Sequence, residues 1–335
     1  MEEMTYEKAG VSIAREERGI RGIKLLLEKT FKFREGKVGE VFTSLGHYAN
    51  LITLGDFYVA FTMDGVGSKI LVAEELKKYG TIGIDLVAMN VNDLICVGAE
   101  PVAMVDYIAM QKIDENMMKE IAYGIYEGAK KAGIAIVGGE TATLPEMIAG
   151  IGENCFDLVG AAIGIVKKEE IVTGEKIRPG DVVLGLASSG IHSNGLTLAR
   201  KVLPKNMWVD LLKPTRIYVK EFLELRGKFE ILGAAHITGG GFRNLLRLGS
   251  YGFYLDNMPD PPMIFKKIKE LGNVSNKEMY KTFNMGVGFC IITSKQDAEK
   301  ILLEYGERFK IRKLGEVIDE KEVRIKVGDE EIILK

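Results

Sequence analysis

Apolar and polar positions along the chain follow two periods in turn, which predicts strands alternating with helices. Short apolar runs that alternate or are rich in β-branched residues predict strands over 57–63, 102–109, 134–139, 158–166, 182–187 and 285–292. Apolar residues three and four apart predict helices over 16–30, 114–131, 215–226 and 295–308. Shorter helices are expected before Pro204 and over 242–248, and short strands over 316–335. Strands and helices occur in both halves, so the fold class is α/β or mixed α+β.

Two stretches depart from this alternation. Residues 81–98 are apolar nearly all round, which predicts a helix buried on every side. Its polar exceptions are Asp85, Asn90, Asn92 and Asp93. Residues 32–56 are irregular and rich in glycine, which predicts a mobile loop over a site.

Length and charge limit the class of protein. A chain of 335 residues is long enough for about two domains, and the charged segment 167–180 is the best boundary between them. We therefore expect domains over 1–167 and 168–335, the second with a mixed sheet and flanking helices. The net charge of −2 shows no basic surplus for nucleic acid, and no apolar run is long enough for a membrane span.

The cysteines and the first residues bear on the compartment. Cys96, Cys155 and Cys290 are far apart in sequence, which favours reduced thiols over disulfides. The first ten residues lack the cationic and apolar regions of a secretory signal. We expect a cytoplasmic protein with no nucleic-acid or membrane partner.

The stretch 61–69, FTMDGVGSK, is the first candidate site. Asp64 ends an apolar strand, and Gly65, Val66 and Gly67 form a turn before the cation Lys69. Glycines let the backbone amides of such a turn point one way, which with a carboxylate and an ammonium suits a magnesium–polyphosphate ligand. The spacing is not that of a P-loop. A strand turn with a surface ion pair is the alternative.

Three acids stand at the ends of apolar elements or inside them: Asp64, Asp93 and Glu140. Burying an ionised carboxylate is costly unless it is paired, so three converging acids would need a divalent cation, although Lys69 could neutralise one of them. Oxygen ligands without a Cys or His cluster favour Mg²⁺ over zinc. The alternative is that each acid caps a helix or meets a separate lysine.

Two of the three histidines lie in polar, glycine-containing turns. His192 is in SSGIHSNG, and His236 comes just before Thr238 and the glycines 239–241. Such turns at helix starts bind phosphate, so each histidine is a candidate acid or base beside a phosphorylated substrate. The alternative is two packed histidines with satisfied hydrogen bonds. His47 gives a weaker signal and reads as a loop residue.

Eight stretches in order carry a family resemblance. They are YEKAGVSI (6–13), DGVGSK (64–69), TIGIDLVAMNVNDL (81–94), GAEP (98–101), GGETATLPEM (138–147), SSGIHSNG (188–195), AHITGGGF (235–242) and EMYKTFNMGVG (278–288). With them the chain resembles the phosphoribosylformylglycinamidine cyclo-ligase family over nearly its whole length. The resemblance implies an ATP- and Mg²⁺-dependent closure of formylglycinamidine ribonucleotide to aminoimidazole ribonucleotide, in purine synthesis.

The resemblance also implies an assembly and a set of site residues. The assembly is a homodimer in which residues 1–167 bind ATP and join their sheets into a shared barrel, while 168–335 bind substrate. Magnesium and the ATP phosphates would be held by Asp64, Asp93 and Glu140. Further ATP contacts would come from Lys24, Gly65, Val66, Gly67, Lys69, Asn92, Gly139 and Thr141. Substrate contacts would come from His192, Ser193, Asn194, Gly195, Thr238, Gly239, Gly240 and Gly241. The catalytic candidates are His192, His236 and Lys69.

One segment departs from the family, and other readings remain open. The loop before Asp64 is usually rich in Gly-Gly and Phe-Gly, but 38–56 reads VGEVFTSLGHYANLITLGD, which leaves the roles of His47 and Tyr48 open. The alternatives are thiamine-monophosphate kinase, selenophosphate synthetase, a hydrogenase-maturation relative, or a non-catalytic nucleotide-binding subunit. Selenophosphate synthetase would need a reactive Cys or selenocysteine near its N-terminus, and the first 95 residues contain no Cys. The hydrogenase-maturation relative would need a C-terminal cysteine, whereas this sequence ends EEIILK.

Overall fold

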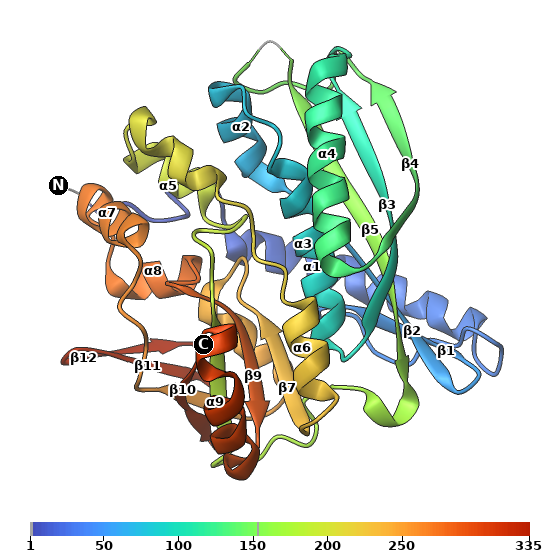
Figure 1. The fold of residues 1–335 in the computed structure, drawn as a ribbon, viewed down its shortest axis with the longest axis vertical. Helices are drawn as coiled ribbons and strands as arrows, with labels where there is room; N and C mark the ends of the chain where they lie inside the picture. The colour runs from blue at the N-terminus through green and yellow to red at the C-terminus, as the bar shows by residue number, and fades with distance from the viewer. Residues whose placement is uncertain (1–2, 153) are drawn as a thin grey trace.

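The chain folds around two β-sheets, one in each half (Figure 1). A computed structural model describes residues 3–152 and 154–335. The first sheet is five-stranded in the order β1-β2-β5-β3-β4, with only β3 and β4 parallel. Its strands are β1 Asn50–Leu54, β2 Phe57–Gly65, β3 Glu100–Met110, β4 Ala135–Thr143 and β5 Phe156–Lys167.

The second sheet is seven-stranded in the order β12-β11-β8-β10-β6-β9-β7. Only β8 and β11 run parallel. Its strands are β6 Val182–Ala187, β7 Ile231–His236, β8 Gly252–Leu255, β9 Val287–Thr293, β10 Ile311–Ile318, β11 Val323–Val327 and β12 Glu330–Leu334. All its strands follow residue 180, so the two sheets lie on either side of the expected boundary, which itself stays a prediction.

Two helices cover one face of the first sheet (Figure 1). They are α3 (Ile82–Cys96) and α4 (Glu115–Ala132), and they approach each other closely. A Cβ on Gly83 would lie 2.2 Å from the backbone nitrogen of Ile125, so only glycine fits there. The α3 helix also packs against β7 of the second sheet, which places it between the two halves.

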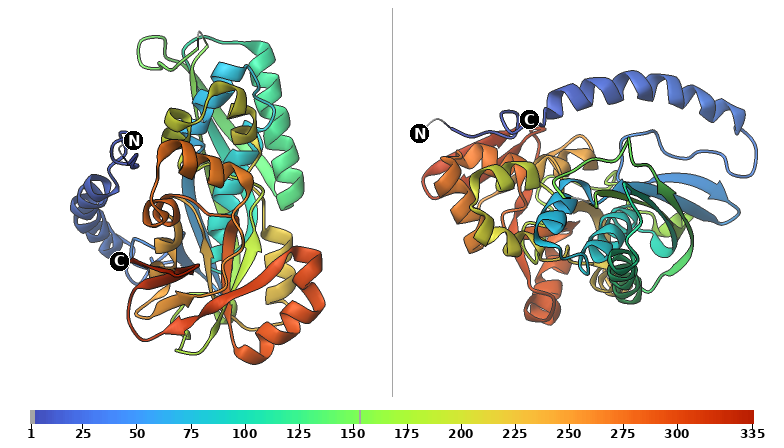
Figure 2. Two further views of the ribbon diagram at one scale, coloured as in Figure 1. Left: turned by 90° about the vertical axis from the view of Figure 1, so that its left-hand side faces the viewer. Right: turned by 90° about the horizontal axis from the view of Figure 1, so that it is seen from above.

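The remaining helices lie outside these layers. The α-helices are α1 Ile13–Leu27, α2 Ile70–Leu76, α5 Leu196–Val202, α6 Val219–Arg226, α7 Met263–Gly272, α8 Asn276–Thr282 and α9 Lys295–Phe309. Short 3₁₀ helices are η1 Glu28–Phe33, η2 Gly67–Lys69, η3 Lys168–Glu170, η4 Lys205–Leu212 and η5 Gly241–Leu248. Figure 2 shows α1 running along the outside of the molecule, apart from both sheets.

The other face of the first sheet is exposed and apolar. Its side chains include Phe61, Met63, Val105, Tyr107 and Ile165, each between 37% and 68% exposed. We call these residues the open face. Isolated exposed apolar residues are common on proteins, but a contiguous set on one sheet face indicates a surface that another molecule covers.

The α/β fold class predicted from the periodicity is confirmed, and the main predicted elements are present. Several elements in less regular sequence were missed: β1, β7, β8, α2, α7 and α8. The helix predicted over 242–248 is a 3₁₀ helix, and the one predicted over 215–226 begins only at Val219. No helix in 3–152 or 154–335 has the length and apolar character of a membrane span.

Candidate active site

A cleft of about 740 Å³ lies between the two halves of the chain. The first half contributes the end of β2 with its turn, and one side of α3. The second half contributes the loop after β6, the turn after β7, and η5. The residues that line the cleft include Asp64, Gly65, Val66, Gly67, Met89, Asp93, Ser193, Asn194, Thr238, Gly239, Gly240, Arg243, Asn244 and Arg247, with Tyr6, Val11, Glu16 and Ile20 from the N-terminal segment.

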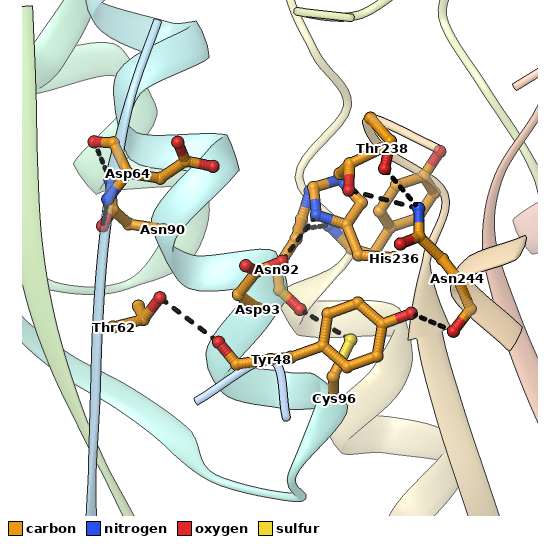
Figure 3. A network of polar contacts seen from close by, with 12 residues as sticks. Tyr48, Thr62, Asp64, Asn90, Asn92, Asp93, Cys96, His236, Thr238 and Asn244 are labelled. Atoms are coloured by element: carbon orange, nitrogen blue, oxygen red, sulfur yellow. Dashed lines mark hydrogen bonds and ion pairs between the residues drawn. The ribbon is translucent and has the colours of Figure 1, made fainter. Parts of the chain in front are cut away.

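The Asn90 side chain on α3 holds Asp64 at the end of β2. The Asn90 side chain accepts from the Asp64 N–H and donates to its carbonyl, both at 3.2 Å (Figure 3). Gly65 N–H donates to Asp64 Oδ1 at 2.8 Å. Burial, followed by the nearby Asp93, raises the pKa of the Asp64 carboxyl to about 6. Two carboxylates that repel each other in one cleft are a suitable pair of ligands for a divalent cation.

Asp93 is oriented by His236, which is fully buried behind it (Figure 3). His236 Nδ1 lies 2.9 Å from Asp93 Oδ1, and the Asn92 amide nitrogen lies 3.4 Å from Nε2. Because an amide nitrogen only donates, Nε2 accepts and Nδ1 carries the proton that Asp93 accepts. His236 therefore reaches the cleft only through Asp93.

His192 is not brought to the cleft. It is fully buried, with a backbone φ of 62°, and its Nε2 accepts from the Ser189 N–H at 3.2 Å. Burial holds the pKa of its imidazole well below the usual range, so the ring is neutral. The structure thus packs His192 inside the protein, with its Nδ1 lacking a hydrogen-bond partner among the described residues, and its neighbours Ser193 and Asn194 line the cleft instead.

Lys69, expected to contact nucleotide, also lies away from the cleft. Its side chain is fully buried, and its ammonium donates to Asp85 Oδ1 at 2.9 Å and to the Lys213 carbonyl at 2.6 Å. The same Asp85 oxygen accepts from the N–H and hydroxyl of Thr215 and from the Ser193 hydroxyl. Lys69 neutralises Asp85, not one of the three predicted acids, and this network ties the two halves together.

Glu140 does not join Asp64 and Asp93 within one protomer. It pairs in register with Tyr107, whose side chain lies on the open face. Asp64 and Asp106 both pair with Gly160, one position further along the strands, in the next row of side chains. Successive rows of a sheet point to opposite faces, so Glu140 points away from the cleft. Within the described part of the chain, no three His, Cys, Asp or Glu side chains are grouped to hold a metal.

The other residues expected to touch ATP lie in three places. Gly139 and Thr141 are exposed on β4 with Glu140. Lys24 is on α1, where its ammonium donates to the Leu45 carbonyl and lies 3.6 Å from Glu28. Asn92 is buried, and it accepts from the Tyr218 N–H and donates to the Arg216 carbonyl.

The second half supplies a polar wall to the cleft. Asn244 donates to the Thr238 hydroxyl and the Gly239 carbonyl, which fixes the 238–241 turn. Gly240 has a φ of 94°, a conformation that favours glycine. The amide nitrogen of Asn194 is buried with no hydrogen-bond partner in 3–152 or 154–335, so it is available to a ligand.

Three positions in the matched motifs act from behind this wall. Asn284, in EMYKTFNMGVG, donates to the Gly190 and Ile191 carbonyls and so holds the 188–195 loop. Gly195 is packed against Phe283, since a Cβ there would lie 2.2 Å from the ring. Gly241 meets the Tyr280 carbonyl in the same way. These two glycines support the site without lining it.

Sequence reasoning missed two arginines that line the cleft. Arg243 and Arg247 lie on η5, on the same side as the 238–241 turn. They put positive charge opposite the carboxylates of Asp64 and Asp93. Arginines four apart directly after a glycine-rich turn were the available signal, because a phosphate-binding turn is often completed by a nearby cation.

The arrangement defines a two-domain protein with an interdomain cleft that is acidic on one side and basic on the other. The N-terminal domain of AIR synthase related proteins matches residues 46–166, and the C-terminal domain of the same proteins matches 178–328. The chain therefore belongs to the AIR synthase related proteins and, within them, to the phosphoribosylformylglycinamidine cyclo-ligase family.

The nearer relatives are cyclo-ligases. The phosphoribosylformylglycinamidine cyclo-ligase of Pyrococcus horikoshii is 53% identical, over 99% of this chain and 100% of the relative. That of Thermococcus kodakarensis is 52% identical, over 96% of this chain and 98% of the relative. The hydrogenase maturation protein HypE in complex with ATP is similar in fold, with a TM-score of 0.63 and 16% identity over 83% of this chain and 84% of HypE. The prediction of the family is confirmed, and a likeness at 16% identity extends to the fold alone.

Proposed function

We propose that the chain closes formylglycinamidine ribonucleotide to aminoimidazole ribonucleotide, using ATP and releasing ADP and phosphate. The observation that carries this proposal is the cleft itself, with Asp64 and Asp93 facing Arg243, Arg247 and the 238–241 turn. Such a cleft can hold a metal–nucleotide complex against its acidic wall and a phosphorylated substrate against its basic wall.

The acidic wall fits magnesium. Mg²⁺ is usually bound by one or two carboxylates, with substrate phosphates and water completing its ligands, so Asp64 and Asp93 suffice. Burial and then the nearby Asp93 raise the pKa of Asp64, and such a cation would stabilise its carboxylate. When bound, Mg²⁺ would neutralise charge on the ATP phosphates. We leave Glu140 out of the metal ligands.

The basic wall fits the ribonucleotide phosphate and its reacting end. Arg243, Arg247 and the Thr238 hydroxyl offer donors to anionic oxygens, and the free Asn194 amide offers another. Holding both ends of the substrate in the cleft brings its amidine nitrogen close to its formyl carbon, which lowers the entropy cost of ring closure.

The chemistry proceeds through an activated amide oxygen. The γ-phosphoryl of ATP passes to the formyl oxygen, and the amidine nitrogen then forms the new C–N bond. The C–O bond to the phosphoryl group breaks, phosphate leaves with that oxygen, and the nitrogen loses a proton. The protein contributes positioning and charge stabilisation. His236 acts as a positioning residue for Asp93, because Asp93 and not the imidazole lines the cleft.

The open face supports a homodimer. The open face residues would be covered if two copies paired their first sheets into a barrel, the assembly that the resemblance implies. Burying aromatic and aliphatic side chains of this size favours association by roughly 25 cal/mol per Å² of apolar surface. We also propose that the enzyme works in the cytoplasm.

A substrate panel tests the function. The purified protein is incubated with ATP, Mg²⁺ and either formylglycinamidine ribonucleotide or thiamine monophosphate, and ADP and the ring-closed product are measured. We expect turnover only with the ribonucleotide, and none when EDTA replaces Mg²⁺. ADP release with thiamine monophosphate alone would favour a kinase, and nucleotide binding without any turnover would favour a non-catalytic subunit.

A further inference from the structure

The loop that departs from the family places a tyrosine between the two halves of the chain. Tyr48 follows the irregular part of 38–56, and its side chain is 5% exposed. The Thr62 hydroxyl on β2 donates to its carbonyl at 3.5 Å. His47 packs edge-on against its ring at a centroid distance of 5.7 Å. Burial lowers the pKa of His47, so this neighbour is neutral at physiological pH.

Tyr48 makes two contacts with η5, the helix that carries the arginines of the cleft. Its hydroxyl donates to the Asn244 carbonyl at 2.9 Å. The Arg247 guanidinium lies over its ring, 5.0 Å from the centroid, within the range of a cation–π interaction. One side chain from the first half therefore touches both the backbone at the start of η5 and the cation one turn later.

We propose that Tyr48 is a positioning residue that fixes the Arg247 guanidinium at the wall of the cleft, where it takes an anionic group of the substrate. This rests on the proposed function, because Arg247 matters for activity only if that wall binds the ribonucleotide.

Arg247 needs such a support. An arginine side chain loses much rotamer freedom when it is ordered, so an unsupported one binds an anion less tightly. Within 3–152 and 154–335, no carboxylate pairs with Arg247, and the Tyr48 ring is its partner. An aromatic face orders a guanidinium while leaving its N–H groups to an anion, which a carboxylate partner would occupy.

The matched variants separate the ring from the hydroxyl. Tyr48→Phe keeps the ring and loses the bond to Asn244, and Tyr48→Leu loses both. Arg247→Met removes the cation. Tyr58→Leu is the control, because Tyr58 is also buried in the first half, with Lys168 5.9 Å from its ring centroid, and does not line the cleft.

Steady-state kinetics with formylglycinamidine ribonucleotide and ATP measure the effect. Losing a cation–π contact should raise the KM for the ribonucleotide about threefold to tenfold in Tyr48→Leu, with less change in Tyr48→Phe. The kcat and the KM for ATP should stay near the wild-type values, because Arg247 holds the bound ribonucleotide equally in its ground and transition states. In Arg247→Met, the further change Tyr48→Leu should have no added effect.

The outcomes are distinct. If Tyr48→Leu raises the KM equally in the wild type and in Arg247→Met, Tyr48 has a structural role and the inference is overturned. A fall in kcat of Tyr48→Leu without a rise in KM would overturn it in the same way. A KM unchanged in Tyr48→Leu but raised in Arg247→Met would overturn it as well, while leaving the proposed function intact. A KM unchanged in Arg247→Met would remove the basic wall from the proposed function. Tyr48→Phe answers the question of the hydroxyl if Tyr48→Leu does not fold.

Discussion

Replacing Asp64 by Asn should make the ligand-free protein more stable while it abolishes most of the activity. The Asp64 carboxyl has a pKa of about 6 in place of its ordinary 3.8, because it is buried and Asp93 is close. Asn keeps an oxygen that can accept from the Gly65 N–H, and it removes the charge. The carboxylate is a group that the fold tolerates for the sake of a ligand.

The size of the effect follows from linkage. Since one pKa unit is worth about 1.4 kcal/mol, the ionised carboxylate costs the folded state at most about 3 kcal/mol. Because the pKa is raised on folding, the unfolded chain gives up its proton first as pH rises through 4. Stability is therefore lost between about pH 4 and pH 6, and the full cost is present above pH 6.

Urea unfolding in EDTA measures this cost. The single tryptophan, Trp208, is buried and reports unfolding by its fluorescence. At pH 8 the Asn variant should exceed the wild type by up to about 3 kcal/mol, and at pH 4 the difference should vanish. A variant that is no more stable than the wild type at pH 8 would refute the reasoning. Near-normal turnover at saturating magnesium would separately refute Asp64 as a metal ligand.

Three further changes test other parts of the structure. Lys69→Met should cost about 3–5 kcal/mol of stability, because it leaves Asp85 buried and charged, and adding Asp85→Asn should recover most of it; additive losses in urea unfolding would contradict this. His236→Ala should lower kcat at least about tenfold, and His236→Asn, which can still donate to Asp93, should recover part without changing the shape of the pH–rate profile. Val105→Glu on the open face should convert dimers to monomers in sedimentation, whereas Val209→Glu, at a 50% exposed position, should not.

The hydrophobic periodicity was sufficient to predict the regular helices and strands. It could not predict the partners of polar side chains, because tertiary contacts decide these. The 81–98 segment is nearly all apolar, and a helix buried on every side was predicted and is present as α3. Its polar exceptions divide between two partners that no local pattern indicates. Asn90 binds the backbone of Asp64, while Asp85, Asn92 and Asp93 face the second half.

The site was predictable as a set of motifs but not as a geometry. Asp64, Asp93, Asn194 and the 238–241 turn, named separately in the sequence, line one cleft. Lys69 does not, because its ammonium neutralises Asp85, sixteen residues further along the chain. The position of Glu140 depends on its row in the sheet, which only the strand register reveals.

The placement of α3 between the two sheets makes the sequences of the two halves depend on each other. Asp85 and Asn92 lie on one helix of the first half, yet their hydrogen bonds end on Thr215, Arg216 and Tyr218 of the second. A substitution in either half at these hydrogen bonds therefore leaves a buried polar group in the other half without its partner. The two halves should consequently accept mutations at these contacts only in matched pairs. Exchanging one half with that of a distant relative should yield insoluble chimaeras unless the residues that make these hydrogen bonds are exchanged with it.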